Sequence, residues 1–482
     1  MVLSEVVLFC EALPVQDEKR YAVQVSPEAT HKIFLRICND TTMLKRDPFV
    51  CAISKTDEIY LQIFLNNVST MPDKNRTSYP KEKINILFLE NISDTAVKNF
   101  TAAGYTNVRK LNGALSEEQL MNEIKNVHLL GIRSKTKITQ KVLDAAEKLQ
   151  AIGCFCIGVN QVDLKAATKK GVVVFNAPYS NTRSVAELVI GSSIMLIRKI
   201  IDKNTAAHKG VWMKDATGSY ELRGKTLGII GYGNIGSQLS VLAESLGMKV
   251  IFYDTETKLP LGNASSFRNL KELVSKSDIV SLHVPELPST KNMINKNLLK
   301  NFKKGSILIN YARGEVVELD SLAKALADGH IAGAAIDVFP WEPEKNGDTF
   351  TTPLQGLSNV ILTPHIGGST QEAQSNIGED VSGKLFNYLE KGVSFGSHTI
   401  PALSLPPQEG THRILHIHNN VPGVLSEINT QLSKNKINIL AQYLTTNEDI
   451  GYVVLDIDKS LSKNALELLK KVKETIKVRM LY

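Results

Sequence analysis

Three glycines directly after a short apolar segment constrain this 482-residue chain more than any other feature. Gly231, Gly233 and Gly236 follow Leu227–Ile230, and apolar residues then recur at steps of three and four, as on one face of a helix. In such a strand–turn–helix the first glycine forms the turn, the second lets backbone approach a pyrophosphate, and the third lets helix and strand pack closely. Asp254 ends the next predicted strand, near the spacing of about 20 residues typical of an acid that binds ribose. Because that acid disfavours a 2′-phosphate, the sequence predicts NAD rather than NADP.

The glycine loop lies within a predicted α/β domain over residues 181–368. Apolar runs alternate there with helical patterns, which is typical of a parallel sheet covered on both faces. The expected strands are 226–230, 249–253, 279–284, 306–309, 333–338 and 360–362. One long helix over 184–201 is expected before them, as a spine between domains. His283, inside the third strand, is expected to be structural and to lack a partner.

Four polar residues of this domain come at or just beyond the carboxyl ends of predicted strands, where open α/β sheets bind their ligands. They are Arg313, Asp337, Glu342 and His365. His365 can take or return a hydroxyl proton near neutral pH, and a carboxylate such as Glu342 favours its protonated form. Arg313 offers a planar fork for a substrate carboxylate, and Asp337 is placed to orient a nicotinamide amide. Any one alone could equally be a turn or surface residue, so the prediction of hydride exchange depends on their joint placement.

A second, smaller α/β domain is predicted from residues 81–180 together with 369–400, because 371–389 has the pattern of a helix that returns to it. Its expected strands are 84–89, 127–132, 152–159 and 172–175, with a helix over 139–149. Arg133, Ser134 and Lys135 come directly after one of these strands. Two cations and a hydroxyl at a strand end suit a phosphate group, and the alternative is a solvated basic loop.

The two ends of the chain differ from this centre. Residues 1–80 share no pattern with it and are expected to be an N-terminal extension of unknown structure. The proline-containing stretch 396–410 is expected to be a linker. Residues 411–482 follow the order strand–helix–strand–strand–helix–strand, which predicts a split βαβ domain and, without nucleophiles of its own, a sensor or dimerising module. The expected strands are 413–418, 437–439 with 442–445, 452–458 and 476–480, and the expected helices are 423–432 and 462–472.

Composition narrows the partners and the compartment. The net charge of +7 comes from 56 basic and 49 acidic residues without a long basic block, so nucleic acid is not an expected partner, and anionic small substrates fit as well. No apolar run approaches the ~20 residues of a membrane span. The five cysteines lack metal-ligand spacing, and the first residues lack a cationic targeting region. We therefore expect no metal site and a reduced, cytoplasmic protein.

Longer motifs give residues 84–482 a resemblance to the D-isomer-specific 2-hydroxyacid dehydrogenase family. These motifs are Asn176–Glu187, Leu227–Gly236, Asn310–Gly314, Ala335–Pro340 with Glu342-Pro343, and Thr363–Thr370. Arg133-Ser134 and the tail Leu415–Leu425 resemble the branch of the family that acts on 3-phospho-D-glycerate and carries a C-terminal ACT regulatory domain. Lys135 departs from the arginine expected in bacterial members of that branch, which keeps the charge but removes the bidentate fork.

The resemblance implies a fold and a role for each matching residue. The fold would be two Rossmann-like parallel-sheet domains and a ferredoxin-like ACT domain that pairs with its copy in a homotetramer. The catalytic residues would be Arg313, Glu342 and His365. The NAD contacts would be Gly231, Gly233, Asn234, Ile235, Gly236, Asp254, Tyr311, Ala312, Arg313, Asp337, His365, Ile366, Gly367 and Gly368. Arg133, Ser134, Lys135 and Arg313 would bind the substrate, and His418, Asn420 and Asn438 would bind L-serine as an effector.

The expected reaction is NAD-dependent oxidation of 3-phospho-D-glycerate to 3-phosphohydroxypyruvate, the first step of L-serine synthesis by the phosphorylated route, restrained by serine. Two alternatives stay open. One is reduction of another keto acid, such as 2-oxoglutarate or glyoxylate, which is also expected as a second activity. The other is a non-enzymatic scaffold that senses dinucleotides, similar to corepressors built on this fold.

Overall fold

A computed structural model of the chain describes residues 10–13, 20–23, 79–343, 347–407 and 410–481. The chain divides into two compact units, residues 1–73 and 74–482. In the first unit, strands β1 (Cys10–Leu13) and β2 (Arg20–Val23) pair antiparallel. The remainder of the predicted N-terminal extension up to residue 78 lies outside the described residues.

The first sheet of the second unit has five parallel strands in the order β4-β3-β5-β6-β7. They are β3 (Ile86–Phe88), β4 (Val108–Lys110), β5 (Leu129–Ile132), β6 (Ala151–Cys154) and β7 (Val173–Asn176). Helix α3 packs on one face, and helices α4, α5 and α6 pack on the other. These helices are α3 (Asp94–Ala102), α4 (Glu117–Glu123), α5 (Gln140–Ala145) and α6 (Leu164–Lys169). The predicted strand 152–159 is wrong beyond Cys154, where the chain leaves the sheet, and the half-exposed edge strand β4 was not predicted.

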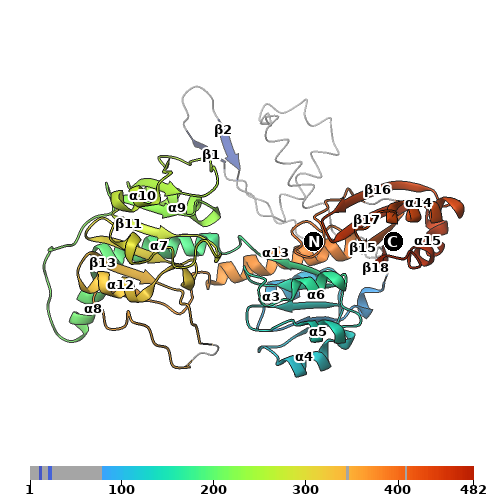
Figure 1. Cartoon of the computed structure of the whole chain (residues 1–482), viewed down its shortest axis with the longest axis horizontal. Coiled ribbons are helices and arrows are strands. Elements are labelled where there is room, and N and C mark those ends of the chain that lie inside the picture. Colours follow the sequence, from blue (N-terminus) through green and yellow to red (C-terminus); the bar gives the residue numbers. More distant parts are fainter. Residues whose placement is uncertain (1–9, 14–19, 24–78, 344–346, 408–409, 482) are drawn as a thin grey trace, which may run out of the picture. The chain divides into compact units, whose positions relative to one another are not determined.

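Helix α13 (Gln371–Lys391), the long orange helix of Figure 1, returns to this sheet as the sequence predicted. Its apolar residues share one core with α3 and the strands, and Ser375 Oγ lies 3.1 Å from Thr95 Oγ1. The approach is close because Gly153 has no side chain. A Cβ at this position would lie 2.7 Å from Val381 Cγ1.

The second sheet has seven parallel strands in the order β10-β9-β8-β11-β12-β13-β14 (Figure 1). They are β8 (Thr226–Ile230), β9 (Lys249–Tyr253), β10 (Ser265–Ser266), β11 (Ile279–Leu282), β12 (Ser306–Asn310), β13 (Ile331–Ile336) and β14 (Val360–Leu362). One face is covered by α7 (Thr182–Ile197) and α9 (Asn234–Ser245), and the other by α10 (Leu270–Lys276), α11 (Lys296–Leu299) and α12 (Leu319–Ala327). The register aligns the last residues of five strands, so the residues that follow them all emerge at one edge.

The single long helix predicted over 184–201 is wrong. Lys199 has a left-handed φ of +51°, which ends α7 and starts a separate helix, α8 (Ile200–His208). Helix α8 has no buried residue, whereas α7 buries seven. The apolar pattern alone did not reveal this break, because a single left-handed residue changes direction without changing composition.

The C-terminal sheet is antiparallel with the order β16-β17-β15-β18, the ferredoxin-like arrangement that the sequence predicted. Its strands are β15 (His412–Asn419), β16 (Ile439–Thr446), β17 (Ile450–Ile457) and β18 (Thr475–Leu481). Helices α14 (Val424–Lys434) and α15 (Ser462–Leu469) cover one face. The other face joins the core around α13, and the Tyr452 hydroxyl donates to the Gly392 carbonyl oxygen at 2.6 Å.

Two searches of the described residues found nothing. No helix among them is long and apolar enough to cross a membrane. No group of three or more His, Cys, Asp or Glu side chains in those same ranges is placed to hold a metal ion.

Candidate active site

The glycine loop after β8 has the geometry of a pyrophosphate site. Gly231 has φ +93°, and a Cβ there would lie 2.5 Å from the His283 carbonyl oxygen. A Cβ at Gly236 would lie 2.3 Å from the Gly231 carbonyl oxygen. A Cβ at Gly233 would meet nothing within 4 Å, and Gly233 is exposed as the N-cap of α9. The first and third glycines are therefore required by the protein itself, while the second leaves open space in front of unpaired helix N–H groups, which fits a dinucleotide.

Asp254, directly after β9, is tied to this loop. Its Oδ2 accepts a hydrogen bond from the Tyr232 N–H at 2.7 Å, and its Oδ1 accepts from the Glu256 N–H at 3.0 Å. These bonds hold a carboxylate beside the glycine turn, where the ribose of an NAD bound there would be expected. The residues present therefore fit NAD.

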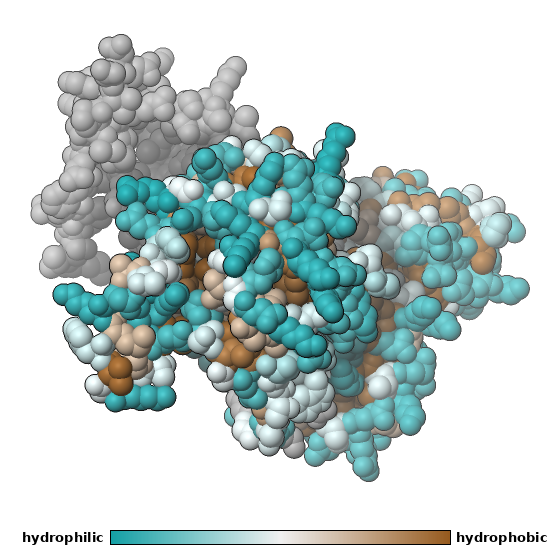
Figure 2. Space-filling model, turned by 60° about the vertical axis from the view of Figure 1, so that its left-hand side comes forward, coloured by the Kyte–Doolittle hydropathy of each residue, from teal (hydrophilic) through white to brown (hydrophobic). Residues whose placement is uncertain are grey.

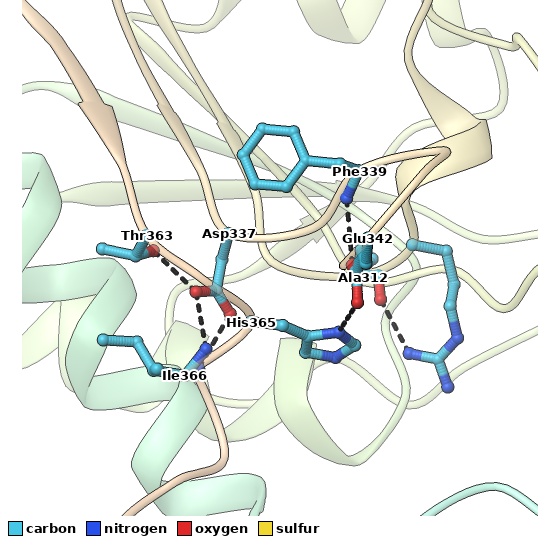
Figure 3. Close-up of polar contacts among 9 residues, drawn as sticks. Ala312, Asp337, Phe339, Glu342, Thr363, His365 and Ile366 are labelled. Atoms are coloured by element: carbon cyan, nitrogen blue, oxygen red, sulfur yellow. Dashed lines mark hydrogen bonds and ion pairs between the residues drawn. The ribbon is translucent and has the colours of Figure 1, made fainter. Parts of the chain in front are cut away.

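His365 and Glu342 form the polar centre at the carboxyl edge of the second sheet (Figure 3). His365 Nδ1 lies 2.8 Å from Glu342 Oε2, and Glu342 Oε1 accepts from the Phe339 N–H at 3.1 Å. The His365 side chain is 53% exposed. One ring nitrogen is thus oriented by a fixed carboxylate, and the other, Nε2, remains for a substrate proton.

The contact between His365 and Glu342 favours the ionised form of each side chain. The hydrogen bond from Glu342 raises the pKa of His365 above 6.5, and this outweighs the partial burial that works to lower it. Partial burial alone would raise the pKa of Glu342, but the hydrogen bond and positive charge of His365 bring that pKa below its usual value. The imidazolium is therefore stabilised near neutral pH.

Asp337 holds the backbone that carries His365. Its Oδ1 accepts from the Thr363 hydroxyl at 2.6 Å and from the Ile366 N–H at 2.8 Å, and its Oδ2 accepts from the Gly367 N–H at 2.8 Å (Figure 3). His365 itself has a left-handed φ of +54°, and its N–H donates to the Asp337 carbonyl oxygen at 2.8 Å. The buried Asp337 carboxylate thus keeps a strained residue in place. Its predicted contact with a nicotinamide amide stays a prediction.

Arg313 lies on the loop after β12, beside the Glu342 loop. Its NH1 donates to the Ala312 carbonyl oxygen at 2.7 Å, and its own carbonyl accepts from Asn310 Nδ2 at 3.0 Å. The loops pack tightly at Gly314, where a Cβ would lie 2.0 Å from the Phe339 carbonyl carbon. The guanidinium therefore stands close to the His365–Glu342 pair, whose pKa values both respond to its charge.

The remaining predicted cofactor contacts differ in whether their side chains are buried in the core or exposed. The Tyr311 hydroxyl lies 2.6 Å from Ser192 Oγ, and burial raises its pKa to about 12, so its side chain belongs to the core. Asn234 is exposed, and Ile366 is 42% exposed. At Gly368, a Cβ would lie 2.3 Å from Asn181 Nδ2, so a larger residue there would displace the Asn181 side chain.

The basic loop Arg133–Lys135 follows β5 at the carboxyl edge of the first sheet. Ser134 and Lys135 are exposed, and Arg133 is partly exposed. The sequence reasoning missed two residues behind this loop. The Glu90 carboxylate accepts three of its backbone N–H groups, and Gln161 Nε2 donates to the Arg133 carbonyl oxygen at 2.7 Å. The one sequence signal for Glu90 is its place directly after the predicted strand 84–89, at the same edge, and this signal does not distinguish it from a surface charge.

His283 is structural as predicted, but the expectation that it lacks a partner is wrong. Its Nε2 lies 2.9 Å from Ser281 Oγ. Burial lowers the pKa of His283 to about 3, so the ring is neutral. The His283 backbone carbonyl lies directly behind Gly231.

The three predicted effector residues do not meet within one copy of the chain. His418 is buried at one end of β15 opposite Gly451, and Asn420 Nδ2 donates to the Asn447 carbonyl oxygen at 2.6 Å at that same end. Asn438 directly precedes β16, whose first residue Ile439 lies opposite Ile457, at the other end of the sheet.

Comparisons with known proteins identify the family of the chain. Residues 190–367 match the family model of the NAD-binding domain of D-isomer-specific 2-hydroxyacid dehydrogenases, and residues 414–477 match that of an ACT domain similar to the acetohydroxyacid synthase small subunit. The D-3-phosphoglycerate dehydrogenase of Haemophilus influenzae is 54% identical over 408 residues, which cover 85% of this chain and 100% of the relative. That of Dictyostelium discoideum is 50% identical over 84% of this chain and 99% of its own length. The crystal structure of D-lactate dehydrogenase from Aquifex aeolicus with NAD and lactic acid is 27% identical, with a TM-score of 0.56 over 66% of this chain and all of that one.

A hydride-transfer centre, a dinucleotide loop and a C-terminal ACT sheet thus occur in one chain. Full-length relatives at more than 50% identity match it. The chain therefore belongs to the D-3-phosphoglycerate dehydrogenases of the D-isomer-specific 2-hydroxyacid dehydrogenase family, NAD-dependent oxidoreductases with an ACT domain.

Proposed function

We propose that this enzyme oxidises the C2 hydroxyl of 3-phospho-D-glycerate to the ketone of 3-phosphohydroxypyruvate and catalyses the reverse reduction. The observation that carries the proposal is the 2.8 Å contact between His365 Nδ1 and Glu342 Oε2 at the edge that also presents Arg313. When NAD is bound, its nicotinamide accepts the hydride with both electrons of the broken C–H bond.

His365 supplies the proton chemistry. Its Nε2 takes the hydroxyl proton as the C2–O bond becomes a carbonyl, and Glu342 stabilises the resulting imidazolium. In the reverse direction the protonated ring returns that proton to the new hydroxyl. Arg313 holds the neighbouring carboxylate and polarises the carbonyl oxygen.

The side chains of Arg133, Ser134 and Lys135 would bind the substrate phosphate from the other sheet. Their support is charge and exposure at a carboxyl edge. The loss of NADH absorbance with phosphohydroxypyruvate tests the reaction, with His365→Ala as the control. If the wild type turns over no faster than this control, the proposed reaction is refuted. That result would favour the dinucleotide-sensing scaffold instead.

Selectivity for the phosphate separates this function from a general keto-acid reductase. We expect kcat/KM for phosphohydroxypyruvate to exceed that for unphosphorylated hydroxypyruvate. A lower, second activity on 2-oxoglutarate is expected because Arg313 and His365 do not need a phosphate. Equal values for all three substrates would support the keto-acid alternative.

L-Serine would act between two ACT domains and restrain domain closure. The two ends of the sheet support this, because His418 and Asn420 lie at one end and Asn438 at the other. Strand β16 is an edge strand with the alternately exposed residues Leu440, Gln442, Leu444 and Thr446. Antiparallel pairing of two β16 edges would bring Asn438 of one copy to the end of the other copy's sheet at which His418 and Asn420 lie. No heat on titrating the full chain with millimolar serine would remove this part of the proposal.

A second self-association surface would complete the tetramer. The face drawn in Figure 2 is largely hydrophilic, with hydrophobic residues in small patches. Against this background Val211, Trp212, Met213 and Tyr220 are all exposed on the segment between α8 and β8, and Trp212 is 85% exposed. Exposed apolar residues gathered on one segment indicate a protein contact. Sedimentation should show a tetramer for the wild type and a smaller species for Trp212→Ala.

The same proposal assigns a role to each domain and a cellular compartment to the protein. Residues 81–180 with 369–400 would bind the substrate, 181–368 would bind NAD, and 411–482 would bind the effector. The buried, unpaired thiol of Cys154 and the partly buried one of Cys156 support a reducing, cytoplasmic setting.

A further inference from the structure

Glu90 is an unusual residue at the carboxyl edge of the first sheet. It follows β3, it is only 8% exposed, and it has a left-handed φ of +59°. Asn91 is left-handed as well, with φ +50°. Two consecutive residues other than glycine in this conformation are costly, and such strain persists where the surrounding structure holds it in place.

This left-handed backbone places the Glu90 carboxylate against the N–H groups of a neighbouring loop. Its Oε1 accepts hydrogen bonds from the N–H of Arg133 at 3.2 Å and of Thr136 at 2.8 Å, and its Oε2 accepts from the N–H of Lys135 at 3.0 Å. Three donors from four consecutive residues therefore converge on one buried carboxylate. A carboxylate with three amide donors is strongly held, because each bond is charge-assisted.

A second buried side chain holds the same loop by its carbonyl. Gln161 is 3% exposed, and its Nε2 donates to the Arg133 carbonyl oxygen at 2.7 Å. The loop is thus fixed at its N–H groups by Glu90 and at its first carbonyl by Gln161. Its side chains remain for a ligand, together with the single N–H of Ser134, which Glu90 does not bind.

We infer that Glu90 is a positioning residue that determines phosphate selectivity by fixing the loop from which Arg133 and Lys135 project. The inference rests on the proposed phosphate site and deepens it. Because Glu90 occupies these backbone N–H groups, the phosphate is recognised by the Arg133 and Lys135 side chains rather than by a nest of amides. A carboxylate so close to an anion site would otherwise repel the anion, and the three amide donors offset its charge.

Glu90→Gln tests the inference in the full-length enzyme. The amide replaces one acceptor oxygen by an NH₂ group, which faces a backbone donor and releases part of the loop. Glu82→Gln, the same change at an exposed position of the same domain, is the matched control. The readout is kcat/KM for phosphohydroxypyruvate divided by kcat/KM for hydroxypyruvate, which differ only in the phosphate.

We expect Glu90→Gln to lower this ratio about tenfold or more, mainly through KM for phosphohydroxypyruvate. The kinetics with hydroxypyruvate should stay within about twofold of wild type, as should both substrates in Glu82→Gln. The loss in the double variant Glu90→Gln/Arg133→Ala should be smaller than the sum of the two single losses, because Glu90 acts partly through Arg133 and partly through Lys135.

The outcomes separate the inference from the function on which it rests. A wild-type ratio near one would show that no phosphate site exists, and the proposed substrate would fail first. A large wild-type ratio that is unchanged in Glu90→Gln, or a variant that weakens both substrates equally, would overturn the positioning role alone. If Glu90→Gln does not fold, Glu90→Asp is read in the same way, because it keeps the charge but withdraws the carboxylate by one methylene.

Discussion

Two loops, one at the carboxyl edge of each parallel sheet, are both held by a buried carboxylate. They differ in how firmly the side chains that they carry are fixed. In the NAD-binding sheet, Asp337 accepts the N–H groups of Ile366 and Gly367 and thereby holds the loop of His365. In the other sheet, Glu90 accepts three N–H groups and holds the loop of Arg133 and Lys135. Each loop thus has one carboxylate behind it. The left-handed residue His365 lies in the loop that is held, whereas Glu90 and Asn91 are left-handed in the segment that holds the other loop.

The loops differ in whether the exposed side chain, His365 or Lys135, is itself held by a second group. His365 has a second carboxylate, Glu342, on its ring, so both its backbone and its imidazole are oriented. No hydrogen bond or ion pair is recorded for the Lys135 side chain among the described residues, and its ammonium ends in solvent. Proton transfer requires a nitrogen within hydrogen-bond reach of one oxygen, whereas a phosphate with several oxygens can be held by a mobile cation. A carboxylate that accepts loop N–H groups is thus sufficient where a cation needs only to reach an anion, whereas proton transfer needs a second carboxylate that orients the side chain itself.

The largest effect should follow removal of the fixed imidazole. His365→Ala is expected to lower kcat by about 10²- to 10⁴-fold, because no other group replaces the general base. Steady-state kinetics in both directions measure it, and NAD binding by fluorescence should persist. A loss below tenfold would contradict the assignment of His365.

The shared device is tested next, at Asp337. Asp337→Asn leaves one of the Ile366 and Gly367 N–H groups facing an NH₂ group in a buried site, which should lower the free energy of unfolding by about 1–3 kcal/mol. The left-handed His365 should then relax, and kcat should fall about tenfold or more. Urea unfolding measures the free energy of unfolding, and steady-state kinetics measure kcat. A variant with unchanged stability and full kcat would show that the loop keeps its conformation without the Asp337 carboxylate.

The second support of the imidazole is tested by pH. The raised pKa of His365 depends first on Glu342, so Glu342→Gln should shift the pH profile of keto-acid reduction to lower pH. In the wild type, reduction should fall and oxidation should rise as pH increases through a value above 6.5. The ion pair's contribution to stability should be complete below pH 6.5 for as long as Glu342 is ionised, and it should be lost over the same rise. Identical profiles for both proteins would exclude this role of Glu342.

The smallest effect is expected at the loop without a second support. Lys135→Arg should lower KM for phosphohydroxypyruvate by about two- to fivefold, because the guanidinium can bind two phosphate oxygens at once. The KM for hydroxypyruvate should not change. A rise in KM for phosphohydroxypyruvate would show that Lys135 is itself held in a specific geometry.

Much of the fold was predictable from the pattern of apolar residues. Strands β8, β9 and β14 have the predicted bounds, because each is a short, mostly apolar run between turn residues. The edge strand β4 and the break at Lys199 were missed, because a half-exposed strand and a single left-handed residue leave little trace in composition. Glu90 was missed because an acid after a strand is indistinguishable from a surface charge until its partners, 43 to 46 residues away, are placed.

The chain by itself determined which groups are available: a glycine turn that only glycine can form, an imidazole and a carboxylate after parallel strands, and a cationic loop. Local sterics and hydrophobic periodicity are sufficient for that, because they act between near neighbours. Only the tertiary structure decided which groups meet. It placed Glu342 on His365, Asp337 on the backbone of Ile366 and Gly367, and Glu90 on the backbone of the Arg133–Lys135 loop. Such contacts depend on strand order and register, which bring distant residues to one edge and which no local pattern encodes.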